Sequence, residues 1–231
     1  MTYAIFHGSP RKGNTYRATK IFIDELAKSG DVRFTEFFLP GALPAFCTGC
    51  QLCLGNPREI CPHSQYVTPI FDAVLSADAL VFTTPHYGAC SMSGAMKNLL
   101  DHLDFLTLTV APRAEIFGKK AFILTTGAGS KAAGKPIVHY LKNWGVNRVY
   151  ELGFRMFTDK WDAMPEKKQA RFDRKLRRTA RKFCGAPRKR PHFSTVFMYH
   201  MSKLILKNNV GEGNYPYEYW KEHGYFKKRP F

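Results

Sequence analysis

Long apolar runs are missing from the sequence, and so is a recognisable export signal. No segment approaches the roughly 18 to 20 uninterrupted apolar residues that a membrane-spanning helix requires, although 45% of the residues are hydrophobic. The N-terminus continues directly into TYAIFHG, without the basic region and cleavage site of a secretory signal. We therefore expect a folded cytoplasmic protein, in which 231 residues form either one compact domain with an appendage or two small domains.

Acidic residues are also scarce, and the resulting positive charge is concentrated near the C-terminus. The sequence has 18 Asp and Glu against 35 Lys and Arg, which gives a formal net charge of +17. Residues 160–231 hold 19 of the basic and 6 of the acidic residues, so residues 1–159 carry only +4. The densest basic stretch, PEKKQARFDRKLRRTARKF, predicts an amphipathic helix with one apolar stripe, formed by Phe172, Leu176, Ala180 and Phe183. The charge pattern favours a solvated cationic face and leaves an anionic, nucleic-acid or acidic partner open.

The first glycine-rich stretch, GSPRKGNT, lacks the residue that defines a triphosphate-binding loop. Gly8 and Gly13 have the P-loop spacing, but Asn14 occupies the position of the P-loop lysine. No acidic strand end suited to Mg²⁺ is evident, so the pattern argues against a nucleoside triphosphatase. The dinucleotide pattern G-x-G-x-x-G is also missing after the first expected strand, which argues against a dinucleotide-binding domain.

What this stretch does contain suits one terminal phosphate. Backbone N–H groups at a helix N-terminus attract a phosphate dianion, and short polar side chains and one arginine stand beside them. The candidates are Ser9, Arg11, Asn14 and Thr15, with Gly13 in the same loop. A plain polar turn with Asn14 or Thr15 as the helix cap is the alternative.

Strands and helices alternate along residues 1–159. Short apolar runs predict five strands, at 2–6, 32–38, 77–84, 119–126 and 147–154. Stretches with helical periodicity lie between them, at 14–29, 65–78, 93–106 and 135–145. The unusual loops follow the first, third and fourth strands, whose carboxyl ends are neighbours in the strand order 2-1-3-4-5. We therefore predict a doubly wound α/β domain with a five-stranded parallel sheet at residues 1–159, followed by a basic, aromatic helical extension at 160–231.

Two further loops suit an aromatic ring. TPHYG, after the third expected strand, is a turn that frees backbone amides for ring heteroatoms, while Tyr87 offers a flat face. TTGAG, after the fourth, lacks bulky side chains and lets the backbone approach a ring edge. In the strand order 2-1-3-4-5 such a site suits a flavin mononucleotide rather than a dinucleotide. Ordinary strand-to-helix turns are the alternative for both loops.

GSPRKGNT, TPHYG with the later Lys97 and Asp101, and TTGAG together resemble the flavodoxin-like NAD(P)H-dependent FMN reductases, including their iron–sulfur flavoprotein branch. The likeness covers roughly residues 1–155. It implies an oxidoreductase in which FMN takes hydride from NAD(P)H and passes electrons to a small acceptor, such as a quinone, a nitroaromatic compound or a free flavin. It also implies homodimers or homotetramers.

The resemblance further assigns the FMN contacts. It implies that the phosphate is bound by Ser9, Arg11, Asn14 and Thr15, that the isoalloxazine ring meets Pro85, His86, Tyr87 and Gly88, and that the ring is closed over by Gly127, Ala128 and Gly129. No side chain is assigned a catalytic role, because the flavin carries the chemistry. His86 either forms a hydrogen bond at the ring or is structural.

Six cysteines are present, and four of them are close together in the sequence. Cys47, Cys50, Cys53 and Cys61 form the pattern Cys-x2-Cys-x2-Cys-x7-Cys. Three thiolates at steps of three can wrap a 4Fe-4S cluster, with the fourth arriving from a longer loop, and a cluster makes the protein an electron carrier for a redox partner. Reduced, unliganded thiols and a zinc site are the alternatives, and disulfides are not expected in a cytosolic chain. Cys90 and Cys184 are expected to be small core or surface thiols.

The end of the chain is partly apolar and rich in aromatic residues. FSTVFMYHMSKLILKN, after the basic PRKRP, is apolar around much of a helix, and NYPYEYWKEHGYFKKRPF follows it. Such segments need a surface to cover. The candidates are a neighbouring subunit, the entrance to the flavin site and an anionic membrane surface. No recognised nucleic-acid module frames them, so we do not expect a nucleic-acid partner.

Overall fold

A five-stranded sheet forms the centre of the computed structural model, which describes residues 1–54, 61–88, 91–146, 148–186 and 191–231. The strands are β1 (Thr2–His7), β2 (Arg33–Phe38), β3 (Ala79–Pro85), β4 (Lys120–Gly127) and β5 (Arg148–Arg155). Neighbouring strands are parallel, in the order β2-β1-β3-β4-β5. This confirms the predicted doubly wound α/β sheet with strand order 2-1-3-4-5.

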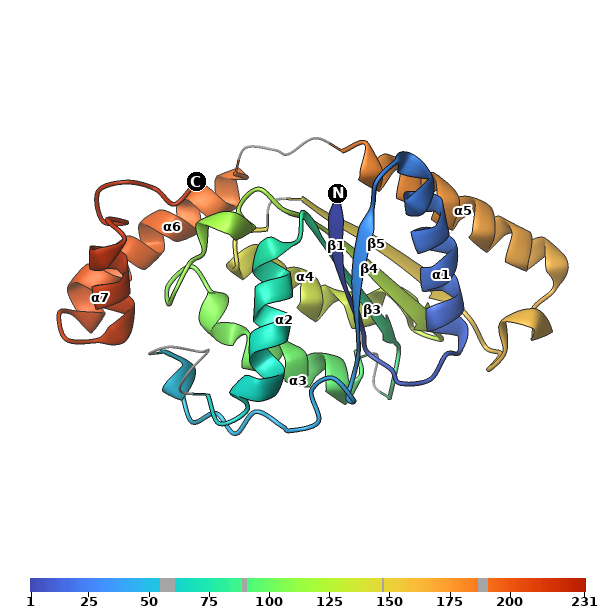
Figure 1. Cartoon of the computed structure of the whole chain (residues 1–231), viewed down its shortest axis with the longest axis horizontal. Coiled ribbons are helices and arrows are strands. Elements are labelled where there is room, and N and C mark those ends of the chain that lie inside the picture. Colours follow the sequence, from blue (N-terminus) through green and yellow to red (C-terminus); the bar gives the residue numbers. More distant parts are fainter. Residues whose placement is uncertain (55–60, 89–90, 147, 187–190) are drawn as a thin grey trace.

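Helices cover both faces of the sheet (Figure 1). One face carries α1 (Asn14–Leu26) and α5 (Glu166–Cys184), and the other carries α2 (Ser64–Ser76), α3 (Gly94–His102) and α4 (Lys135–Asn143). Within β1, Ala4 and Phe6 belong to the core beneath α2, α3 and α4. Tyr3 and Ile5 belong to the core beneath α1 and α5. Because both faces are buried, the strands are continuous apolar runs in the sequence rather than alternating ones.

The basic helix predicted from the sequence is α5, and its apolar stripe faces the sheet as expected. The stripe is fully buried and consists of Phe172, Leu176, Ala180 and Phe183. The Lys120 ammonium on β4 donates to the carbonyl oxygens of Phe183 and Cys184, at 2.6 and 2.8 Å, where the helix dipole is negative. α5 is therefore fixed on the sheet along its length and at its end. The domain boundary expected between residues 159 and 160 stays a prediction.

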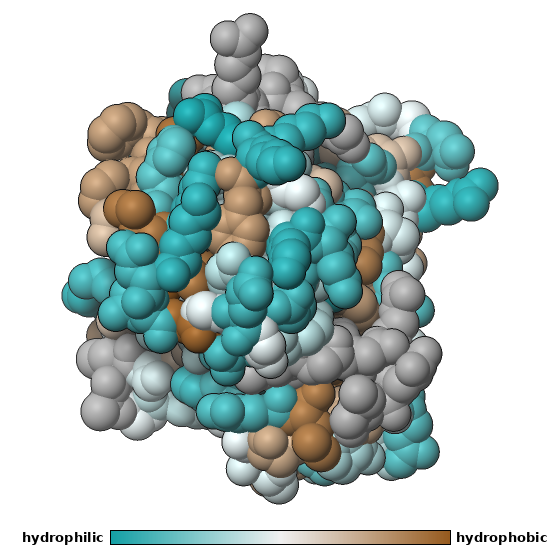
Figure 2. All heavy atoms as spheres, turned by 90° about the vertical axis from the view of Figure 1, so that its left-hand side faces the viewer, coloured by the Kyte–Doolittle hydropathy of each residue, from teal (hydrophilic) through white to brown (hydrophobic). Residues whose placement is uncertain are grey.

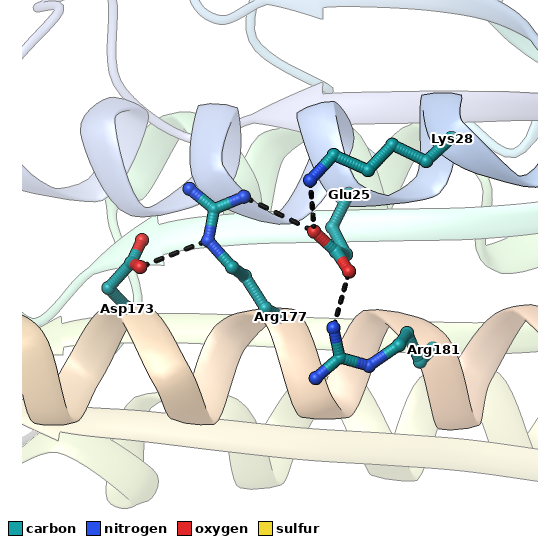
Figure 3. Close-up of polar contacts among 5 residues, drawn as sticks. All are labelled: Glu25, Lys28, Asp173, Arg177 and Arg181. Carbon is teal, nitrogen blue, oxygen red and sulfur yellow. Dashed lines mark hydrogen bonds and ion pairs between the residues drawn. The ribbon is translucent and has the colours of Figure 1, made fainter.

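A buried carboxylate also links α5 to α1 (Figure 3). Glu25 on α1 accepts hydrogen bonds from Arg177 at 3.2 Å and from Arg181 at 2.6 Å, both on α5. Lys28, just beyond α1, donates to the same carboxylate at 2.9 Å, and Arg177 also pairs with Asp173 at 3.0 Å. Lys28 and the two arginines lower the pKa of Glu25 to about 2. The carboxylate is thus charged at neutral pH and holds the two helices together.

The end of the chain forms a third core beside the sheet. Its elements are α6 (Phe193–Ile205), a π-helical turn (Leu206–Val210) and α7 (Tyr215–Glu222). Tyr199 of α6 stacks on Trp220 of α7 with ring centroids 5.3 Å apart. Arg113 donates to the Tyr219 hydroxyl at 2.7 Å, and Ala111 is buried in the same core. These helices lie at the opposite end of the molecule from α5 (Figure 1). None of the helices in the described ranges is long and apolar enough to cross a membrane.

Candidate functional site

The loop GSPRKGNT connects β1 to α1 at the carboxyl edge of the sheet. The Gly8 amide donates to the Thr83 carbonyl of β3 at 2.6 Å, and a Cβ at Gly8 would lie 2.9 Å from the Ser93 hydroxyl. Only glycine allows this close approach. Gly13 is the N-cap residue of α1 and has no side chain to cap it, so N–H groups of the first turn lack an intrahelical partner. An anion at this helix end can accept hydrogen bonds from them.

A cavity of about 380 Å³ lies beside this helix end, and residues at the ends of β1, β3 and β4 contribute to it. Its lining includes eight of the residues predicted from the sequence, namely Ser9, Arg11, Gly13, Asn14, Thr15, Pro85, His86 and Gly127. The volume falls within the range of small-molecule sites, roughly 300 to 1,000 Å³. The three loops therefore meet at the carboxyl ends of neighbouring strands, as their positions in the sequence predict.

Four of the predicted residues lie outside this lining, and two of them form the turn after β3. The Tyr87 side chain is 43% exposed, and its hydroxyl accepts a hydrogen bond from Arg11 at 3.0 Å. Because Arg11 lines the cavity, this bond places the tyrosine at the rim. Gly88 follows with a φ of +48°, a backbone conformation that favours glycine.

The other two belong to the TTGAG loop, which packs against His86. A Cβ at Gly129 would collide with the His86 ring, and one at Gly127, where φ is +132°, would lie 2.9 Å from the Cβ of His86. The positive φ and the nearby His86 backbone favour glycine at Gly127, and at Gly129 any side chain would displace the His86 ring. Ala128 between them is exposed. Because these two glycines have no side chains, the loop backbone packs directly against the imidazole and holds it in the cavity wall.

Comparison with known proteins shows which family has this arrangement. The family model described as NADPH-dependent FMN reductase matches residues 1–158, more than half of the chain. The chain belongs to this family. It is therefore an enzyme of the flavin-dependent NAD(P)H oxidoreductases, as the resemblance of its three loops implied. The match does not single out the iron–sulfur branch, and none of the curated proteins matches the sequence.

Several solved structures share the fold of this FMN reductase family member. The azoreductase AzrA has a TM-score of 0.60 at 14% identity, over 79% of this chain and 100% of its own. The apo form of the NADH:FMN oxidoreductase EMOB has a TM-score of 0.54 at 20% identity, over 82% of this chain and 94% of its own. The NAD(P)H:quinone oxidoreductase from Methanothermobacter marburgensis has a TM-score of 0.59 at 16% identity, over 78% and 95%. At these identities the likeness shows the shared fold.

Buried polar atoms in the cavity fit FMN, which carries a phosphate, a hydroxylated chain and a heteroaromatic ring. Three lining residues have a buried atom without a hydrogen-bond partner in the described protein: Asn14 Oδ1, Thr158 Oγ1 and His86 Nε2. Each such atom costs about 1–3 kcal/mol, which a ligand offsets by pairing with the Asn14 or Thr158 oxygen, whereas His86 Nε2 faces the Gly129 backbone. The Asn14 amide nitrogen donates to the Thr158 carbonyl at 2.8 Å, which leaves its oxygen to accept from a ligand hydroxyl.

The lining also holds the donors that a phosphate needs. Ser9 and Arg11 come from the glycine loop, and Lys160 comes from the segment after β5. The Thr15 hydroxyl shares a 2.7 Å hydrogen bond with that of Thr126, which fixes it in the wall. Two cations and several hydroxyl groups suit a dianion.

Sequence reasoning missed five residues of this lining, which are Thr126, Met156, Thr158, Asp159 and Lys160. Four of them follow β5, where the resemblance ends and no motif is recognisable. The topology could have identified this segment, because the carboxyl end of β5 lies beside that of β4 in a parallel sheet. Thr126 had its own signal, since it belongs to the polar end of an otherwise apolar strand.

The cysteine motif lines a second cavity, of about 610 Å³, next to the C-terminal end of α3. Its lining includes Cys47, Cys50, Cys53 and Cys61, together with His63 and His102. The two imidazoles are hydrogen-bonded, with ring nitrogens 2.9 Å apart. The Cys47 amide donates to the Asn98 side chain of α3 at 2.9 Å, which anchors the loop. Burial, aided by the neighbouring thiols, raises the pKa of Cys53.

The four thiols share one cavity without being arranged as metal ligands. All four are free cysteines, and the ranges that the structure describes contain no group of three or more His, Cys, Asp or Glu side chains placed to bind a metal. The 4Fe-4S cluster expected at this motif therefore stays a prediction. Cys184 is partly buried at the end of α5, and Cys90 lies outside the described residues.

Proposed function

We propose that the protein is an FMN-dependent NAD(P)H oxidoreductase that passes electrons from a nicotinamide cofactor to a small acceptor, namely a quinone, a nitroaromatic compound or a flavin. The observation that carries this proposal is the cavity at the ends of β1, β3 and β4. Residues in its lining have buried polar atoms without a hydrogen-bond partner in the described protein, and FMN can supply such partners. Bound FMN supplies the redox chemistry, since it exchanges hydride and electrons with small molecules. The protein supplies binding and orientation.

The phosphate end of the site is assigned to the glycine loop and the segment after β5. Ser9, Arg11 and Thr15, with the N-terminus of α1, bind the phosphate. Lys160 adds a second cation. Thr158 donates from its unpartnered hydroxyl to the phosphate or the ribityl chain.

The ring end of the site is assigned to the TPHYG and TTGAG loops. The imidazole of His86 lines the cavity and would pack beside the flavin ring, with its Nε2 edge held against Gly129 of the second loop. Tyr87 stands at the rim, where its exposed ring can stack on a planar acceptor or on nicotinamide. Arg11, which is bonded to the Tyr87 hydroxyl, ties the phosphate-binding loop to this rim.

The names of the three related structures favour a planar, conjugated acceptor. They are an azoreductase, an NADH:FMN oxidoreductase and an NAD(P)H:quinone oxidoreductase. We extend this acceptor class to the present chain because Tyr87 offers a ring at the mouth of the cavity.

An FMN titration of the flavin-free protein tests the site. The wild-type chain is expected to bind one FMN, and Thr158→Val to bind it about 10- to 150-fold more weakly, because a buried hydrogen bond to a charged group contributes about 1.5–3 kcal/mol. Thr179→Val on α5, whose hydroxyl bonds only within its own helix among the contacts described, is the matched control. Equal FMN affinity in the wild type and Thr158→Val would remove Thr158 from the site, and no binding by the wild type would overturn the proposal.

A second candidate function is an electron carrier that uses FMN and a 4Fe-4S cluster to serve a redox protein. The observation that favours it is the convergence of Cys47, Cys50, Cys53 and Cys61 on one cavity. Iron and acid-labile sulfide, assayed on anaerobically purified protein, decide between the two functions. Four of each per chain support the carrier, and their loss in Cys50→Ser is expected. Flavin without iron supports the reductase alone.

We further propose that the enzyme works in the cytoplasm and that it is a homodimer or homotetramer, the assembly that its family resemblance implies. Large apolar side chains are exposed near the cysteine cavity, with Phe46 72% exposed beside Cys47 and Leu52 47% exposed beside Cys53. Such residues are typical of a subunit contact. Light scattering of the FMN-loaded chain gives its mass, and a monomer at all concentrations contradicts the assembly.

A further inference from the structure

The apolar face of α6 points into solvent rather than into the protein. Five large side chains are 40 to 79% exposed, namely Phe193, Phe197, Met201, Leu204 and Ile205. Their successive spacings of four, four, three and one residues place them on a single stripe of the helix. We call this stripe the α6 face. Figure 2 views the end of the molecule that carries α6 and α7 and shows hydrophobic groups at its surface among hydrophilic ones.

Specific contacts on the opposite side of α6 fix this orientation. The Tyr199 hydroxyl donates to the Tyr225 carbonyl at 2.6 Å, and its ring stacks on Trp220. The Ser202 and Thr109 hydroxyls are hydrogen-bonded at 2.8 Å. Turning the helix to bury its apolar stripe would leave these buried polar groups without partners, which is costly. These contacts therefore hold α6 in the orientation that leaves the α6 face exposed.

Cations border the α6 face, and carboxylates are missing from this part of the sequence. Residues 191–211 contain no Asp or Glu, and the sequence immediately before them reads PRKR. By helical position, Lys203 lies along one edge of the stripe with His200 between it and Phe193, and Lys207 follows in the π-helical turn Leu206–Val210. Arg229 lies beside His200, with nitrogens 3.2 Å apart, and the Lys207 ammonium is 5.7 Å from the centre of the Phe226 ring. An exposed apolar stripe with cations at its edge is complementary to a partner that has an apolar interior and an anionic outer layer.

We propose that the α6 face binds an anionic phospholipid surface, with its apolar side chains in the boundary between headgroups and acyl chains and its lysines among the headgroups. Two copies of α6 packed face to face would bring Lys203, Lys207 and Arg229 of each chain close together without a carboxylate from residues 191–211 to neutralise them, and the next carboxylates, Glu212 and Glu218, pair with Lys221. A negatively charged membrane neutralises these cations directly. This binding is independent of the proposed reductase activity.

Vesicle pelleting of the full chain tests the proposal. The chain is expected to pellet with vesicles of phosphatidylcholine and phosphatidylserine mixed two to one, more weakly with phosphatidylcholine alone, and less as salt is added. Phe197→Ser combined with Leu204→Ser should weaken binding about tenfold or more, because both side chains lose their apolar contact with lipid. Phe157→Ser is the matched control, because Phe157 is 78% exposed at the end of β5, outside α6.

A charge variant gives a second, independent measurement. Lys203→Gln combined with Lys207→Gln should weaken binding to the anionic vesicles only, whereas Lys221→Gln, already paired with Glu212 on the described surface, should change it little. Circular dichroism and FMN binding verify that each variant is folded. Failure of the wild type to pellet, or wild-type binding by both double variants, overturns the proposal. A dimer in light scattering that Phe197→Ser and Leu204→Ser abolish overturns it as well, because a second copy then covers the α6 face.

Discussion

α5 and α6 are both amphipathic helices of the C-terminal region, but the apolar face of α5 packs on the protein and that of α6 faces solvent. α5 buries Phe172, Leu176, Ala180 and Phe183 against the sheet and turns its cations outward. α6 buries Thr195, Tyr199 and Ser202 and turns the α6 face outward. Periodicity in the sequence shows that a helix has an apolar face, and the tertiary contacts decide what covers it.

The largest expected effect of this difference is on stability. Leu176→Ala removes a fully buried side chain and should lower the free energy of unfolding by about 2–5 kcal/mol. Leu204→Ala removes the same atoms from a side chain that is 53% exposed and should change it by about 0.5 kcal/mol or less. Urea unfolding of both variants measures the two values. Equal losses would show that the α6 face is covered in the folded protein.

A smaller effect separates flavin binding from α6. Lys160→Ala should weaken FMN binding by about 1–2 kcal/mol, because a charge-assisted hydrogen bond to the phosphate is lost. Lys203→Ala on α6 should leave the FMN affinity unchanged. Fluorescence titration with FMN measures both, and an unchanged affinity in Lys160→Ala removes the segment after β5 from the phosphate site.

The smallest effect concerns the ion pairs that hold α5 and have no counterpart on α6 among the described residues. The pKa of Glu25 is lowered to about 2 from the usual 4.5, so its charge stabilises the fold above pH 4.5 and the stabilisation is lost as the pH falls toward 2. Glu25→Gln should lower the free energy of unfolding at pH 7 by only about 1 kcal/mol. The value is small because Arg177 and Arg181 are 34% and 63% exposed and solvent weakens their ion pairs with Glu25.

Urea unfolding across this pH range distinguishes the carboxylate from general acid effects. Between pH 4.5 and 2, the free energy of unfolding should fall less in Glu25→Gln than in the wild type. Asp24→Asn, which removes a 58% exposed carboxylate one position earlier, is the control and should keep it. Identical pH profiles for wild type and Glu25→Gln would contradict the assigned role of the ion pairs.

Much of the fold was predictable because it depends on local patterns. Apolar runs located all five strands, and the positions of the unusual loops gave the order 2-1-3-4-5. The stripe of α5 was predicted residue by residue, because a buried face repeats at helical spacing. The orientation of α6 was not predictable, since it depends on Tyr199 and Ser202 finding partners far away in the sequence.

The candidate site was predictable where loops carry motifs and unpredictable where topology alone brings residues together. Glycine patterns identified the loops at Gly8 and Gly127, which both need glycine for steric reasons. Thr158 and Lys160 have no motif and reach the cavity only because β5 lies beside β4. The cysteines were found from their spacing, but ligand geometry depends on the bound metal as well as the chain.

The most direct test of the central claim is anaerobic reduction of the purified chain by NADH and NADPH, followed by its visible absorption. We predict one bound FMN per chain, bleached by at least one of the two donors and restored by a quinone. A chain that binds no flavin, or whose bound flavin neither donor bleaches, would contradict the account.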